Sequence, residues 1–204
     1  VKPLEAILDL DPGDESTLAR LREIHEKRRN WQGLLDLMKR ELPLRQGAAR
    51  RALLGEMAKC AAERLSDPKE AIELWNDVLE ASEDDAEALE KLSGLYEREK
   101  RWPELADVLR RQAAAIGSAP AALPLLEKLG VLCSEKLTAR EAAVEAWQRI
   151  LEIKPDHAKA VRALRDLHVA GEDWSALEAL FAPRGAWAEL CETLSQAADR
   201  ADLR

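Results

Sequence analysis

Three stretches at a constant spacing decide the fold: NWQGLLDLM at residues 30–38, RWPELADVL at 101–109 and DWSALEALF at 173–181. Trp102 follows Trp31 by 71 residues, and Trp174 follows Trp102 by 72. AIELWNDVLE (71–80) and AVEAWQRILE (143–152) form a second set, in which two tryptophans again stand 72 residues apart. The two sets alternate, so the period divides into two segments of about 36 residues. Internal repetition of this length is typical of proteins built by stacking one small module.

Each module is predicted to be a pair of α-helices. Ala143, Trp147, Ile150 and Leu151 recur at the i, i+4, i+7 and i+8 spacing of one helix face. Alanine, leucine, glutamate and arginine dominate the chain and favour helix, and proline and glycine stand between the amphipathic segments. We therefore predict an all-α protein with helices near 3–10, 14–29, 31–43, 47–65, 68–82, 85–100, 102–116, 121–136, 139–153, 156–171, 173–182 and 185–200.

Two helix starts carry capping patterns. Asp67-Pro68-Lys69-Glu70 has an N-cap aspartate, a proline at the first helical position and an acid that can reciprocate. Thr138-Ala139-Arg140-Glu141 has the form of a capping box.

The modules resemble tetratricopeptide (TPR) repeats. Leu-x2-Leu-Ser-x2-Tyr at 89–96 and Leu-x2-Leu-Gly-x2-Cys at 126–133 match the first helix of that family, and Ala-x3-Trp at 71–75 and 143–147 match the second. Leucine or valine replaces the family's first tryptophan, and the hairpins around 61–71 and 133–143 carry one extra residue. The half-a-TPR repeats of RNA-processing factors also use periodic tryptophans and are an alternative relative.

The resemblance implies a right-handed α-solenoid of about five helical hairpins with a flanking helix at each end. We expect one domain over 1–204, with repeats at 14–43, 46–82, 85–116, 119–153 and 156–182 and a terminal helix at 185–200. The chain opens abruptly on Val1, and we expect it to be a fragment of a longer protein.

Composition narrows the range of possible functions and locations. The net charge of −8 argues against nucleic acid as the partner, because affinity for phosphates needs a basic surplus. No apolar run is long enough to span a bilayer. The three cysteines are far apart, so we expect reduced, buried thiols in a cytoplasmic protein rather than disulfides or a zinc cluster. The alanine- and arginine-rich composition suggests a bacterial source.

No residue pattern points to catalysis, a metal or a cofactor. His25, Tyr96 and His168 each stand six residues before one of the tryptophans of the first set, and a ring repeated at one register is expected to pack rather than to bind. His157 is expected at the surface. Gly94 and Gly130 fall inside helices, where small residues allow close helix approach. We therefore expect a protein that is not an enzyme.

The TPR resemblance implies that a partner peptide or helix binds in a concave groove lined by the first helix of each hairpin. The residues expected to face this groove are Glu23, Glu26, Lys59, Glu90, Glu97, Val131, Arg162 and Asp166. None is asparagine, which disfavours the carboxylate clamp of TPR chaperone adaptors. The mixed charge suggests a partner with alternating charge and a few apolar anchors.

The leading hypothesis is a scaffold or adaptor that binds another protein and no small-molecule substrate. The alternatives are an RNA-processing scaffold of the half-a-TPR kind and a regulatory domain of a larger enzyme. Basic pairs near helix ends, such as Lys39-Arg40 and Arg110-Arg111, are expected to compensate helix dipoles. Trp187, Leu190, Cys191 and Leu194 form an apolar face on the last helix that would allow self-association if uncovered.

Overall fold

The computed structural model describes the backbone of residues 1–202 and the side chains of residues 1–199. These residues form α-helices joined by short turns, and no β-strand occurs among them. The chain divides into two compact units, residues 1–101 and 102–204. Unit 1 contains α1 (Lys2–Leu10), α2 (Glu15–Lys27), α3 (Trp31–Glu41), α4 (Gly47–Cys60), α5 (Pro68–Ala81) and α6 (Ala86–Arg98). Unit 2 contains α7 (Trp102–Ile116), α8 (Leu123–Glu135), α9 (Arg140–Ile153), α10 (Ala158–Ala170), α11 (Trp174–Phe181) and α12 (Trp187–Asp202).

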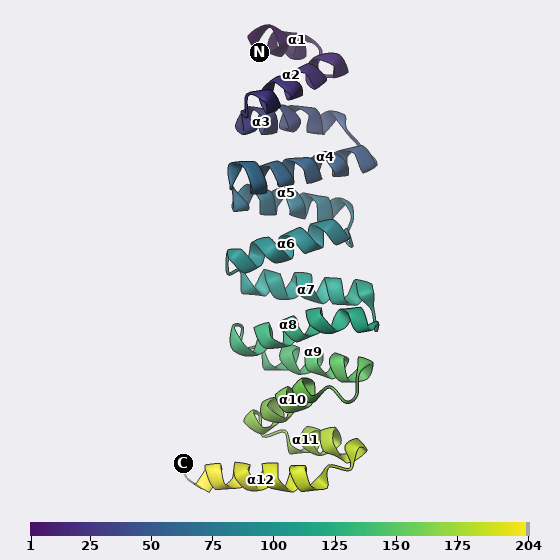
Figure 1. Ribbon diagram of the computed structural model, residues 1–204, viewed down its shortest axis with the longest axis vertical. Helices are drawn as coiled ribbons and strands as arrows, with labels where there is room; N and C mark the ends of the chain where they lie inside the picture. Colours follow the sequence, from purple (N-terminus) through teal and green to yellow (C-terminus); the bar gives the residue numbers. More distant parts are fainter. Residues whose placement is uncertain (203–204) are drawn as a thin grey trace. The chain divides into compact units, whose positions relative to one another are not determined.

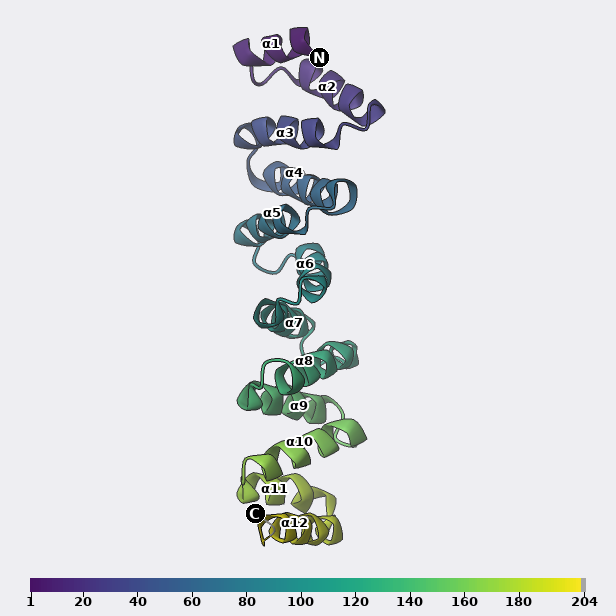
Figure 2. The ribbon, with the colours of Figure 1, turned by 90° about the vertical axis from the view of Figure 1, so that its left-hand side faces the viewer.

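Within each unit a helix packs against the helices before and after it in the sequence (Figure 1). The view turned by 90° separates the helices of unit 1 into two layers, with α4 and α6 displaced to one side of α5 (Figure 2). This is the all-α solenoid architecture of TPR-like hairpins, and every helix predicted from the sequence is present. Each apolar face is buried only against its neighbours, so the core is a continuous seam through each stack. None of the helices in the described part of the chain is long and apolar enough to cross a membrane.

One kind of turn joins α2 to α3, follows α6 and joins α10 to α11. Its left-handed residue is Arg29 (φ 52°), Lys100 (φ 57°) or Glu172 (φ 54°). In all three, the amide of the next residue donates to the carbonyl five positions earlier, that of His25, Tyr96 or His168, at 2.9 Å. This is the Schellman motif, built here with a residue other than glycine at the left-handed position.

A second kind of turn follows α4 and α8 and contains the predicted extra residue. The amide of Asp67 donates to the carbonyl of Ala61, and that of Ala139 to Cys133, each at 2.9 Å and across six positions instead of five. The left-handed residues are Ser66 and Thr138. After α4 the added residue is accommodated in a π-helical turn, Ala61–Leu65, which ends the helix earlier than predicted.

The two predicted caps have different outcomes. Asp67 accepts hydrogen bonds from the amides of Lys69 and Glu70 at 3.1 Å, as predicted. The side chain of Glu70 forms an ion pair with Lys39. The capping box at Thr138 is wrong: Thr138 takes the left-handed conformation, its hydroxyl donates to the carbonyl of Leu137, and Ala139 is the N-cap.

The repeated rings pack as predicted. His25, Tyr96 and His168 are 7%, 4% and 4% exposed. The hydroxyl of Tyr96 lies 3.2 Å from the amide nitrogen of Asn76. Burial lowers the pKa of His168, against a smaller opposing effect of Asp173, so its neutral imidazole is favoured.

The tryptophans of the two sets differ in how deeply they are buried. Trp75 and Trp147 are both 2% exposed and belong to the core. Trp31 and Trp102 are half-buried, and Trp174 is 42% exposed. The first set therefore lies at the margin of the stack.

Gly94 and Gly130 also differ. A Cβ on Gly130 would lie 2.5 Å from Cε2 of Trp147, so this glycine does allow close helix approach. A Cβ on Gly94 would meet nothing within 4 Å, so the same expectation is wrong for Gly94.

A buried carboxylate joins three helices of unit 1. Glu41 of α3 is 5% exposed and accepts from Arg22 of α2 at 2.7 Å and from Arg45 at 2.8 Å. Arg22 also reaches Glu56 of α4 at 3.1 Å. Burial acts to raise the pKa of Glu41, but the hydrogen bonds from the two arginines outweigh it, and the pKa lies below its usual value.

Candidate functional site

Each hairpin consists of a first helix and a second helix. The first helices are the even-numbered ones, α2, α4, α6, α8, α10 and α12. Glu23, Lys59, Gly94, Val131 and Asp166 occupy one register on five of them, at steps of 36, 35, 37 and 35 residues. This register was expected to face the groove. In each unit a cleft opens beside it, between two successive first helices.

The α4–α6 cleft of unit 1 has a volume of about 260 Å³. Its lining residues are Lys59, Ala62, Glu63, Trp75, Glu90, Lys91, Gly94, Leu95 and Arg98. Gly94 keeps this cleft open, because its position is free of neighbouring atoms and any side chain there would enter the space. Lys59 forms an ion pair of 2.7 Å with Glu87 at the rim.

The α10–α12 cleft of unit 2 is larger, at about 560 Å³. Its lining residues are Arg165, Asp166, Val169, Ala170, Glu172, Trp174, Glu189, Glu192, Thr193, Gln196 and Ala197. Four of these carry carboxylates and one carries a guanidinium. The two clefts therefore differ in charge as well as in size.

The structure brings some of the expected groove residues to the clefts. Lys59 and Glu90 both line the α4–α6 cleft, and Asp166 lines the α10–α12 cleft. The others, which line neither cleft, are Glu23, Glu26, Glu97, Val131 and Arg162. Of these, Glu23 forms an ion pair with Lys27 of its own helix, and Val131 is half-buried.

His157 is not the isolated surface residue that was expected. It is the N-cap of α10, where Nδ1 accepts from the amide of Ala160 at 3.3 Å. Its Nε2 lies 3.1 Å from Oε1 of Glu127 on α8, which also binds Lys159 at 2.8 Å. Lys159, followed by His157, lowers the pKa of Glu127. His157 thus joins two first helices of unit 2.

Internal contacts occupy much of the basic surface. Arg40 forms an ion pair with Asp9, and Arg110 pairs with Asp107 at 3.1 Å. The hydrogen bond with Glu70 raises the pKa of Lys39. These cations are engaged within the chain.

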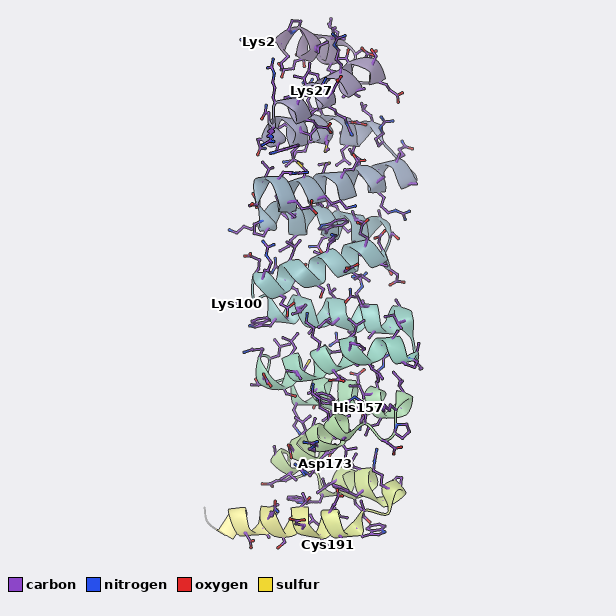
Figure 3. The ribbon with its side chains drawn as sticks, in the orientation of Figure 1. Lys2, Lys27, Lys100, His157, Asp173 and Cys191 are labelled. Carbon is purple, nitrogen blue, oxygen red and sulfur yellow. The ribbon has the colours of Figure 1, made fainter. Side chains whose placement is uncertain are left out.

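The last helix leaves part of its apolar face uncovered. Leu190 is 7% exposed, whereas Trp187 and Leu194 are 51% and 38% exposed. Cys191, which is labelled in Figure 3, is also exposed, which corrects the expectation that all three thiols are buried. Cys60 and Cys133 are buried.

Sequence reasoning missed most of the α10–α12 cleft. Trp174, Glu172, Glu189 and Glu192 were not singled out as binding residues. A signal was present in the acidic "GED" that precedes Trp174 where basic residues precede Trp31 and Trp102.

No protein-family model and no curated protein sequence matches the chain. Among solved structures the chain is similar to YrrB, described as a TPR protein with an unusual peptide-binding site (19% identity, 78% of this chain and 79% of that chain, TM-score 0.46). It is also similar to MamA from Desulfovibrio magneticus RS-1 (18% identity, 90% and 97%, TM-score 0.46). A tetratricopeptide repeat protein from Parabacteroides merdae is 15% identical, with 89% and 71% covered and a TM-score of 0.48. The TPR-like character of this chain rests on its own hairpins, their period and their turns.

Proposed function

We propose that the chain is a non-enzymatic scaffold or adaptor whose first helices bind a peptide or helix of a partner protein. The observation that carries the proposal is the position of the α4–α6 and α10–α12 clefts. Both open between successive first helices, beside the register that the TPR resemblance assigns to the groove. We further propose that the protein acts in the bacterial cytoplasm.

The linings suit a polypeptide partner. Apolar groups lie among charged side chains in both clefts, such as Leu95 and Trp75 in one and Val169 and Trp174 in the other. An apolar centre with a polar rim is the usual anatomy of a protein–protein interface. Both clefts are open and lie on helices, which favours recognition of side chains presented by an extended segment or an amphipathic helix.

The test compares charge-changing substitutions on the two kinds of helix. The tagged chain recovers proteins from an extract of its source cells, and mass spectrometry quantifies each recovered protein. Lys59→Glu and Asp166→Lys alter the clefts, whereas Glu80→Lys on α5 and Gln148→Lys on α9 alter exposed positions of second helices.

We expect the cleft variants to lose a specific partner that the second-helix variants retain. If all four variants recovered the partner equally, the first helices would not be the binding face. Loss with every variant would indicate non-specific electrostatic capture and would equally contradict the proposal.

A further inference from the structure

The described side chains that line the α10–α12 cleft carry an excess of negative charge. Among the described residues that line it the one cation is Arg165, which donates from Nε and Nη2 to Oδ1 of Asp166 at 2.9 and 2.8 Å. Among the described residues Glu172, Glu189 and Glu192 have no ion-pair partner, and Glu192 only accepts a hydrogen bond of 3.1 Å from Gln196. Three carboxylates thus remain for an external cation.

Trp174 adds an aromatic surface to this lining. Its side chain is 42% exposed, and it begins α11 at the edge of the cleft. An indole face beside carboxylates attracts cations, most often guanidinium groups, through its ring quadrupole.

A tryptophan at the equivalent position in unit 1 already binds a cation. Trp31 is the equivalent tryptophan in unit 1, two periods earlier in the sequence. The guanidinium of Arg64 lies over its ring, 4.9 Å from the centroid. Within the described part of unit 2, no cation lies over Trp174.

We propose that the α10–α12 cleft binds an arginine-containing basic segment of a partner protein, with one guanidinium against Trp174 and others at Glu172, Glu189 and Glu192. The proposal rests on the proposed function and names the chemistry of the partner at one of its two clefts. The volume of about 560 Å³ is sufficient for several side chains and lies within the usual range of ligand sites.

The probe is a capped, fluorescently labelled hexapeptide of alternating arginine and leucine, and its counterpart carries glutamate in place of arginine. Fluorescence anisotropy measures the affinity of the intact chain for each peptide. We expect the arginine peptide to bind, with an affinity that falls as salt is raised, and the glutamate peptide not to bind.

Matched variants separate the cleft from the overall negative charge. Glu189→Gln/Glu192→Gln and Glu145→Gln/Glu152→Gln each remove two exposed carboxylates, but the second pair lies on α9, outside the cleft. We expect the first pair to weaken binding by about five- to tenfold and the second to leave it nearly unchanged. Trp174→Leu is expected to weaken binding by about fivefold, and Trp174→Phe by less.

Equal binding of both peptides, or equal effects of the two double variants, would overturn the inference. Failure of this inference is distinguishable from failure of the proposed function. If Lys59→Glu still abolishes recovery of a partner while the arginine peptide does not bind, the scaffold function stands and only the basic partner is wrong.

Discussion

Gly130 and Trp147 pack so closely that no methyl group fits between them: a Cβ on Gly130 would lie 2.5 Å from Cε2 of the indole. Trp147 is 2% exposed and Gly130 is buried, so neither can move away without disturbing α8 and α9. Gly94, by contrast, faces open space on α6.

Alanine at these two glycines is expected to have opposite effects. Gly130→Ala should destabilise the fold by about 1–3 kcal/mol, because the added methyl overpacks the core. Gly94→Ala should stabilise it by about 0.5–1 kcal/mol, because alanine loses less backbone entropy in a helix. Urea denaturation followed by circular dichroism measures both, and effects of the same sign would contradict the packing described for Gly130.

Glycine in place of Lys100 is expected to relieve backbone strain in the left-handed turn after α6. Lys100→Gly should stabilise the fold by about 0.5–1 kcal/mol, since relief of the left-handed strain at φ 57° exceeds the entropic cost of glycine. The control is Lys91→Gly, the same substitution inside α6, which should destabilise by about 1 kcal/mol. Two destabilised variants in the urea titration would show that the turn is unstrained.

Glu41 is expected to make stability depend on acid pH. Its folded pKa lies below the unfolded value, so its contribution is complete above about pH 4.3 and is lost as the pH falls through the folded pKa. Glu41→Gln should cost about 2 kcal/mol at pH 7 and should lose less further stability than the parent between pH 5 and pH 3.

The control for Glu41 is Glu63→Gln, which removes an exposed carboxylate. Urea midpoints across this pH range should follow the parent for Glu63→Gln. A Glu41→Gln curve parallel to the parent would show that the two arginine hydrogen bonds do not stabilise the ionised form.

One thiol per chain is expected to react quickly. Burial raises the pKa of the Cys60 and Cys133 thiols, which disfavours the reactive thiolate, whereas Cys191 is exposed on α12. An aromatic disulfide reagent at pH 8 should modify one thiol in the native chain and three in urea. Cys191→Ser should abolish the fast phase, and a residual fast phase would mean that α4 or α8 opens readily.

Much of the fold could be predicted because the period and the helix ends are local properties of the sequence. Recurring tryptophans, prolines and helical spacing identify every helix, and Asp67 marks its own cap. The Thr138 capping box failed because the turn before α9 needs a left-handed residue one position before the N-cap. That requirement comes from the hydrogen bond between Ala139 and Cys133, which no short motif reveals.

The clefts were harder to predict because they depend on where glycine leaves space and on which side chains point outward. Gly94 and Gly130 have similar settings in the sequence, yet only one lies against a tryptophan ring. Trp174 shares its register with Trp31, but among the described residues an arginine lies over Trp31 and none over Trp174. Lys59, Glu90 and Asp166, which line the clefts, lie on first helices that the period identifies, whereas the carboxylates from α12 reach the cleft through the packing of the last helix.

Turns closed by a hydrogen bond across five residues alternate along the chain with turns closed across six. This alternation limits the ways in which the protein can be lengthened. Copying a single 36-residue segment would place two turns of one kind in succession and bring surfaces together that never meet in this chain. Copying 72 residues preserves every existing junction. Gene duplication, or an engineer who wishes to extend the protein, should therefore succeed most readily by adding hairpins in pairs.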